Sequence, residues 1–319
     1  MKKVSNKVLD RILATFCGAL VGTVMIFFSI YLLATYGAVL FLLTPLVTAT
    51  LSAFIYRLRQ PDEYGWTFTV SFLSLMLPAC LLLLTGLEGV ICVAMAALPA
   101  AIFGFFGTVI GLSAADRFEL KSSQLAMVVF VLPLMGGAES ATVTPPLNEV
   151  VTAIEINAPP EAVWPHVIGY SSLPEPTEWL FRTGIGYPQK VWMEGAGVGA
   201  TRYCDFSTGT YSEPITRWEP PYRLTFDVTN TPPAMKELSL YDDVHAPHLS
   251  QTPRNRRGEF RLTRLAENRT RLEGSTWYDI EMYPQFYWRL WADATVHAVH
   301  QRVFNHIKEQ AEAQMTARR

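Results

Sequence analysis

The pattern of hydrophobic and polar positions changes character near residue 140. Charged residues are absent from four stretches before that point, at 12–56, 64–87, 89–115 and 122–138. Beyond Glu139 charges are dense, and apolar residues alternate with polar ones. A hydrocarbon core about 30 Å thick needs roughly 20 apolar residues for each helical pass. The pattern therefore predicts a multipass membrane region over residues 1–140, a linker at 141–149 and a soluble domain at 150–315.

We expect about five transmembrane helices in the first region. The longest charge-free stretch is long enough for two of them, joined near Tyr36. The five helices are placed at 12–34, 38–56, 66–86, 89–112 and 123–138. The last run is short and carries Pro133, so two topologies stay open. If it spans, which we favour because it is almost wholly apolar, the soluble domain is extracytoplasmic; if it only enters the interface, that domain is cytoplasmic.

The basic residues of the first region fit this arrangement. They cluster before the first helix, after the second and after the fourth: Lys2, Lys3, Lys7, Arg11, Arg57, Arg59, Arg117 and Lys121. The positive-inside rule places all three clusters in the cytoplasm. The opposite hairpin tip has no Lys or Arg, and its Glu88 is expected to be a solvated loop carboxylate. The region is therefore interpreted as an anchor.

The soluble half alternates like a series of strands. Strands are expected at 150–157, 189–195, 200–207, 211–219, 222–229, 258–266 and 270–280. Pro160 and Glu161 are typical of a helix start after the first strand. The segment 231–257 is long, polar and rich in proline, as functional or disordered loops are. A final helix is expected from Pro284 onward, because no further proline or glycine follows.

Four passages carry a family resemblance: VVTAIEINAPPEAVWPHVI (150–168), GVGATRYCDFSTG (197–209), EPITRWEPPYRLTFDV (213–228) and RLEGSTWYDI (271–280). Together with the order of elements, they resemble the SRPBCC superfamily of START-like, Bet v 1-like and polyketide cyclase/dehydrase-type helix-grip domains. The resemblance implies an α+β domain, in which a curved antiparallel sheet surrounds a long C-terminal helix and leaves a cavity for an apolar ligand. The whole chain would then be an all-α transmembrane bundle followed by this domain. Such domains include carriers, receptors and enzymes, so the fold alone does not give the function.

Charge and cysteine usage exclude several other classes of function. The soluble half holds eighteen basic and twenty-one acidic residues, whereas a nucleic-acid-binding protein needs a basic face. Cys204 is the only cysteine beyond residue 139, so that half offers neither an internal disulfide nor a CxxC pair. The glycine-rich run 195–199 lacks the GxxxxGK[ST] pattern of a phosphate loop, and no GxSxG elbow occurs. We therefore expect no cofactor and no nucleic-acid partner.

The final helix presents a mixed face to the predicted sheet. At 100° per residue, an apolar stripe forms from Val296, Val299, Val303 and Ile307, and His300 lies within its arc. Nearer the helix start, a polar ladder forms from Arg289, Asp293 and His297, each four residues apart. A cavity with apolar walls and a few converging polar groups is typical of a ligand site. Asp293 is positioned to accept a hydrogen bond from His297; the alternative is a ladder that only supports the fold.

Other candidate residues lie outside this helix face. Arg202 and Glu213 fall on neighbouring expected strands, where they form a surface ion pair or, if they face the cavity, anchor an acidic head group. The remaining candidate ligand-binding residues are Glu178, Trp277, Tyr278 and Trp288. A metal site is the further alternative; it would combine His245 and His248 of the long loop with His297 and His300.

The leading hypothesis is a membrane-anchored binding protein that holds a lipid or another hydrophobic small molecule, with the bilayer and that molecule as its partners. One alternative is a cyclase- or dehydratase-like enzyme that uses His297 and Asp293 as a general base. Another is a structural or signalling membrane protein without a ligand.

Overall fold

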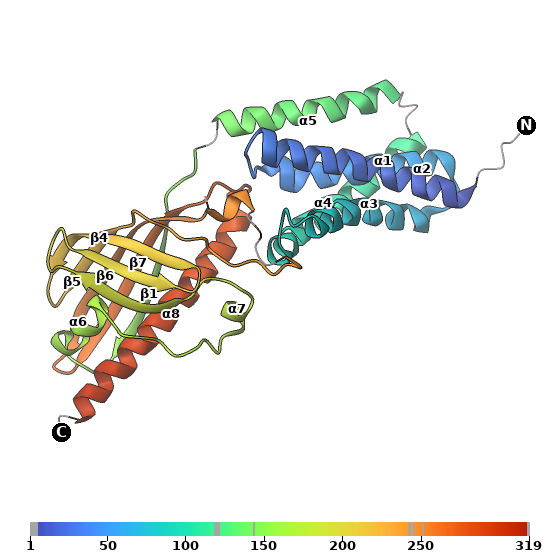
Figure 1. Ribbon diagram of the computed structural model, residues 1–319. Coiled ribbons are helices and arrows are strands. Elements are labelled where there is room, and N and C mark those ends of the chain that lie inside the picture. Colours follow the sequence, from blue (N-terminus) through green and yellow to red (C-terminus); the bar gives the residue numbers. More distant parts are fainter. Residues whose placement is uncertain are drawn as a thin grey trace, which may run out of the picture. The chain divides into compact units, whose positions relative to one another are not determined.

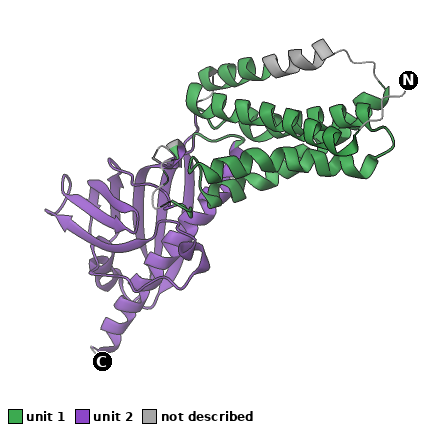
Figure 2. Ribbon diagram, turned by 45° about the vertical axis from the view of Figure 1, so that its right-hand side comes forward, with its two compact units in different colours: residues 1–144, 237–247, 281–284 green, residues 145–236, 248–280, 285–319 purple. Residues whose placement is uncertain are grey.

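The computed structural model of the 319-residue chain describes residues 6–117, 122–142, 144–241, 244, 246–250 and 252–317. It divides into two compact units (Figure 2). The helical unit comprises residues 1–144, 237–247 and 281–284, and the sheet unit comprises 145–236, 248–280 and 285–319. Two short segments from the C-terminal half of the chain thus belong to the helical unit.

The helical unit contains the helices that the charge-free stretches predict (Figure 1). In chain order these are α1 (Lys7–Phe27) with the π-helical turn η1 (Phe28–Leu32), the π-helical turn η2 (Val39–Leu43) with α2 (Thr44–Arg59), α3 (Tyr64–Leu84), α4 (Val90–Arg117) and α5 (Ser122–Thr142). Among the described residues, four helices are long and apolar enough to cross a membrane: Lys7–Leu32, Val39–Arg59, Tyr64–Leu84 and Val90–Arg117.

Glycines let α4 approach α2 closely. A Cβ atom on Gly107 would lie 2.2 Å from the carbonyl oxygen of Leu46, and one on Gly111 would lie 2.5 Å from that of Thr50. The Thr50 hydroxyl lies 2.7 Å from the Leu46 oxygen and 3.0 Å from the Gly107 oxygen. Small residues and interhelical hydrogen bonds of this kind are how helices associate in lipid, where no hydrophobic drive remains.

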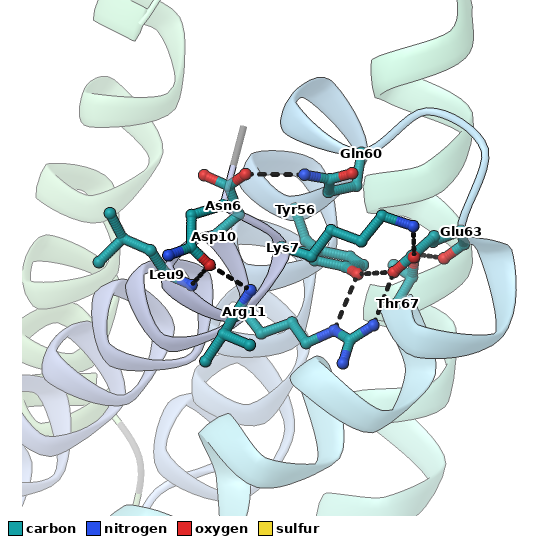
Figure 3. A network of polar contacts seen from close by, with 10 residues as sticks. Asn6, Lys7, Leu9, Asp10, Arg11, Tyr56, Gln60, Glu63 and Thr67 are labelled. Carbon is teal, nitrogen blue, oxygen red and sulfur yellow. Dashed lines mark hydrogen bonds and ion pairs between the residues drawn. The ribbon is translucent and has the colours of Figure 1, made fainter. Parts of the chain in front are cut away.

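A network of charged side chains closes the N-terminal end of the helical unit (Figure 3). Glu63 receives the Lys7 ammonium at 2.7 Å, the Arg11 guanidinium at 2.9 Å and the Tyr56 hydroxyl at 2.5 Å. These hydrogen bonds, that of Lys7 foremost, lower the pKa of Glu63 to about 2. A second carboxylate, Asp10, accepts hydrogen bonds from Arg59 at 2.9 Å and from Gln60 at 2.8 Å, at the C-terminal end of α2.

The opposite end of the helical unit differs from the sequence-based expectation at Glu88. This residue is buried and accepts a hydrogen bond of 3.0 Å from the Tyr36 hydroxyl, so it is no solvated loop carboxylate. Burial raises the pKa of Glu88 to about 7, although the Tyr36 hydrogen bond opposes the rise. The pattern of charges in the sequence did not indicate that Glu88, in the loop between α3 and α4, is buried.

The sheet unit is one seven-stranded antiparallel sheet with a long C-terminal helix, as the sequence predicts (Figure 1). The strands are β1 (Asn148–Ile156), β2 (Pro188–Glu194), β3 (Thr201–Phe206), β4 (Gly209–Glu219), β5 (Arg223–Asp227), β6 (Arg254–Ala266) and β7 (Arg269–Asp279), in the spatial order β1-β7-β6-β5-β4-β3-β2. The helices are α6 (Pro160–Ile168), α7 (Trp179–Arg182), the 3-10 turn η3 (Pro247–Ser250) and α8 (Gln285–Ala317).

The core of the sheet unit lies between the inner face of the sheet and α8. Ile156, Leu224 and Leu272 of the sheet pack with Phe304 and Ile307 of α8 in one buried cluster. Aromatic rings press directly onto strand glycines there. A Cβ atom on Gly274 would lie 2.5 Å from the Phe304 ring, and one on Gly258 would lie 2.4 Å from the Phe226 ring. Glycine is therefore required at both places.

Candidate functional site

The most unusual feature of the core is a buried ion pair on the inner face of the sheet. Arg202 of β3 and Glu213 of β4 lie directly opposite each other in the antiparallel register, and the guanidinium donates to the carboxylate. The two residues are only 3% and 7% exposed. The sequence predicted that they are neighbours across the strands; the structure shows that the pair is in the interior instead of on the surface. Burial raises the pKa of Glu213, while Arg202 opposes the rise.

Arg202 has a further donor to offer. Its guanidinium lies 5.2 Å from the ring centre of Phe226 and 5.4 Å from that of Phe260, so aromatic faces flank the charge. Its Nε group is buried and has no hydrogen-bond partner among the described residues. An unpaired buried donor costs free energy, of order 1–3 kcal/mol. Such a group is suited to an acceptor that arrives with a ligand.

The other polar residues beside this pair are neutral. Burial raises the pKa of the Cys204 thiol to about 12, and burial also raises the pKa of Tyr170 and Tyr211. Cys204 is therefore a thiol and not a nucleophilic thiolate at neutral pH. Among these described residues of the inner face, Arg202 and Glu213 carry the charges, so the pair dominates the electrostatics there.

A second polar group links α8 to β1 and β7. His300 lies 2.9 Å from the Thr152 hydroxyl through Nδ1 and 2.8 Å from the Thr276 hydroxyl through Nε2. The same Thr152 hydroxyl lies 2.7 Å from Nδ1 of His297, whose side chain is exposed. Burial lowers the pKa of His300 to about 4, so it is neutral at pH 7. The four groups form a hydrogen-bonded chain from the surface to the interior.

The polar ladder of α8 is arranged differently from the sequence-based expectation. Asp293 accepts from the Tyr278 hydroxyl of β7 and, at 3.1 Å, from Nε of Arg289. Its hydrogen bonds go to these two residues and not to His297, because His297 turns toward Thr152 on β1. Tyr278 is fully buried, and burial foremost raises its pKa. Asp293 therefore fastens the start of α8 to the sheet.

Sequence reasoning missed Arg302. This residue is buried on α8; it donates to the Pro174 carbonyl and lies 3.6 Å from the Glu178 carboxylate. The rings of Phe181 and Tyr187 lie 5.9 Å and 5.5 Å from its guanidinium carbon. It ties the loop that carries α7 to α8, which explains the place of Glu178. The sequence offered one signal: between residues 290 and 307 of α8, Arg302 is the only Lys or Arg.

The remaining predicted residues lie apart from Arg202. Trp277 pairs with Glu149 of β1 and Arg257 of β6, on the face opposite the core, and Trp288 is buried near the start of α8. His248 is buried in η3, and burial lowers its pKa to about 4. His245, the fourth residue of the metal alternative, lies outside the described residues.

No family model matches the sequence, and no curated protein matches it significantly. Among solved structures, the chain is similar to a point mutant of norcoclaurine synthase from Thalictrum flavum bound to a transition-state analogue. Identity is 12%, the TM-score is 0.35, and the alignment covers 55% of this chain and 99% of that one. The aromatase/cyclase Zhui from a Streptomyces species is similar at 17% identity and a TM-score of 0.35, over 53% and 96% of the two chains. A protein from Mesorhizobium loti is similar at 17% identity and a TM-score of 0.33, over 52% and 98%.

Proposed function

We propose that this protein is a membrane-anchored binding protein. Its ligand is an apolar small molecule with an acidic head group, held between the inner face of the sheet and α8. The single observation that carries the proposal is the buried Arg202, whose Nε donor is unpaired inside an aromatic core. A carboxylate or phosphate oxygen is the natural acceptor for a guanidinium donor.

The ion pair supports a role in recognition better than a role in stability. Removing two charges from water costs several kcal/mol for each ion, and their attraction often fails to repay that cost. An apolar pair of similar size on β3 and β4 would therefore serve the fold at least as well. Glu213 keeps Arg202 neutralised while the site is empty, and an acidic ligand would compete with Glu213 for the same guanidinium.

The helical unit supports the anchoring part of the proposal and gives it a direction. Its basic residues gather at the end where α1 starts and α2 ends, which the positive-inside rule assigns to the cytoplasm. Segments 237–247 and 281–284 belong to the unit and hydrogen-bond to its other end, at Val90 and Tyr36. We therefore place the sheet unit outside the cytoplasm, with α5 as a fifth membrane pass.

Topology is tested with reporters fused after the last residue. Alkaline phosphatase, which is active only after export, should give activity in intact cells, whereas green fluorescent protein at the same position should stay dark. The opposite pattern would place the sheet unit in the cytoplasm and would make α5 an interfacial helix. A fusion after Gln60, in the short α2–α3 loop, is the matched control, because it should report the cytoplasm in either case.

Ligand binding is tested by native mass spectrometry of the full-length chain, purified in mild detergent. The protein should carry an additional mass, and the released molecule should have an acidic head group and an apolar body. A spectrum that contains only the unliganded mass, from protein that is folded and monodisperse, would contradict the proposal.

A further inference from the structure

A short strap from the C-terminal half of the chain is fastened to the helical unit. The strap is the segment Glu237–Tyr241, which follows β5 and precedes η3. The Glu237 carboxylate accepts the backbone N–H groups of Ile91 at 3.1 Å and Cys92 at 3.2 Å. These groups belong to the first turn of α4, where the positive end of the helix dipole favours an anion. Glu237 is therefore the N-terminal cap of a candidate membrane span.

The rest of the strap lies along the ends of two spans. The backbone N–H of Val90 donates to the Leu238 carbonyl at 2.9 Å, and the Tyr241 hydroxyl donates to the Leu84 carbonyl at 2.5 Å. Leu84 is the last residue of α3, and Val90 is the first residue of α4. The strap thus lies at the level where both helices end.

A second segment from the C-terminal half, 281–284, is held at the same end of the helical unit. The backbone N–H of Tyr283 donates to the Tyr36 carbonyl at 2.9 Å, and Met282 forms a parallel bridge with Tyr36. Tyr36 lies between the spans Lys7–Leu32 and Val39–Arg59. Two segments from the C-terminal half thus meet the ends of the spans at this end.

The strap exposes large apolar side chains. Leu238 is 50% and Leu240 is 84% exposed. Tyr241 is exposed beside them. Tyrosine and tryptophan are enriched where membrane proteins meet the head groups. At the end where α2 meets α3, Tyr64 and Trp66 are exposed in this way. At the opposite end, the turns at 33–38 and 85–89 contain no tryptophan.

We propose that three strap residues, Leu238, Leu240 and Tyr241, form an interfacial collar, which inserts into the head-group layer of the membrane that the helical unit spans. The occupant of this surface is the phospholipid bilayer itself. The inference rests on the proposed membrane anchoring and is independent of the proposed ligand. The collar holds the strap at the membrane surface, at the level where α3 ends and α4 begins.

The test measures how close single side chains lie to lipid head groups. Leu238 or Leu240 is replaced, one at a time, by a genetically encoded fluorescent amino acid, which leaves all four cysteines in place. The full-length chain is reconstituted in phosphatidylcholine vesicles, with a spin-label quencher on the head group or bromine on the acyl chains. Trp179 and Val198 are the controls, because they are also strongly exposed but belong to the sheet unit. Phe105, which is exposed in the middle of α4, is the control for the span itself.

Head-group quenching at Leu238 and Leu240 should exceed that at Trp179 and Val198 by about twofold or more. Quenching at the collar equal to that at the two controls, with Phe105 quenched by brominated chains, would overturn the collar and leave the anchoring intact. If brominated chains leave Phe105 unquenched, the anchoring fails, and the collar fails with it.

Discussion

Two groups of charges in this molecule stand in opposite environments. At the N-terminal end of the helical unit, Glu63 is shared by Lys7, Arg11 and Tyr56, and the Lys7 side chain is largely exposed. In the sheet unit, Arg202 and Glu213 have only each other for charge and lie inside an aromatic core. Water and salt screen the first group, so each of its contacts contributes little. The second is not screened, so each charge depends strongly on the other.

The difference indicates what each group does. A partly exposed network with several donors for one carboxylate tolerates the loss of any one of them, as expected of a structure at the end of a helical bundle. A single pair in the interior tolerates no such loss, and an apolar pair would replace it without penalty to the fold. A costly feature with an unpaired donor is consistent with the proposed recognition of an acidic ligand.

The largest expected effect comes from breaking the buried pair on one side. Arg202→Met leaves the Glu213 carboxylate alone in the core, and we expect a loss of about 3–5 kcal/mol in the free energy of unfolding. Near-ultraviolet circular dichroism of the full-length chain during urea denaturation measures it. Glu63→Gln is the matched substitution in the exposed network and should shift the urea midpoint far less, with a shift that shrinks further in high salt. Equal shifts in the two variants would remove the contrast on which the comparison depends.

A smaller effect is expected from pH through His300. Its folded pKa of about 4 lies below the usual value of 6.5, so the unfolded chain binds more protons between these pH values. Stability should therefore be complete above pH 6.5 and fall as the pH drops toward 4, by about 3 kcal/mol at most for this residue. The variant His300→Asn should lose less stability over that window. Glu63, whose pKa is lowered to about 2, should act only below pH 4.5.

Wild-type and His300→Asn proteins are compared in the same urea titrations at pH 7, 6, 5 and 4. His248 titrates in the same window because burial lowers its pKa to about 4 as well, and it stays in both proteins. Identical pH dependence in the two proteins would show that burial does not keep His300 neutral.

Much of the fold was predictable because it depends on local periodicity. The charge-free stretches located the helices, and alternation located all seven strands. It also placed Arg202 and Glu213 on neighbouring strands, and the structure adds the register that puts them directly opposite each other. Burial of that pair was not predictable, because it depends on how the sheet curves around α8.

Contacts that join distant parts of the chain were also missed. Asp293 bonds to Tyr278 rather than to His297, although the helical spacing of Asp293 and His297 favours a contact, because strand side chains compete for both residues. The strap was expected to be part of a long loop, and no sequence pattern around Glu237 indicates that this residue caps α4. Arg302 was overlooked because its partners, the Pro174 carbonyl and Glu178, lie in a loop without periodicity.

The most direct test of the account is the ligand content of the double variant Arg202→Met/Glu213→Leu. The control is Arg223→Gln/Glu259→Gln, which removes an ion pair of 2.8 Å between β5 and β6, on the face of the sheet opposite the core. Full-length wild type, the double variant and this control are purified identically and compared by native mass spectrometry. We predict that the double variant is as stable as wild type yet has lost the bound acidic molecule, which the control retains. A double variant that still carries the same molecule, or a wild type that carries none, would contradict the claim that the buried pair exists for recognition.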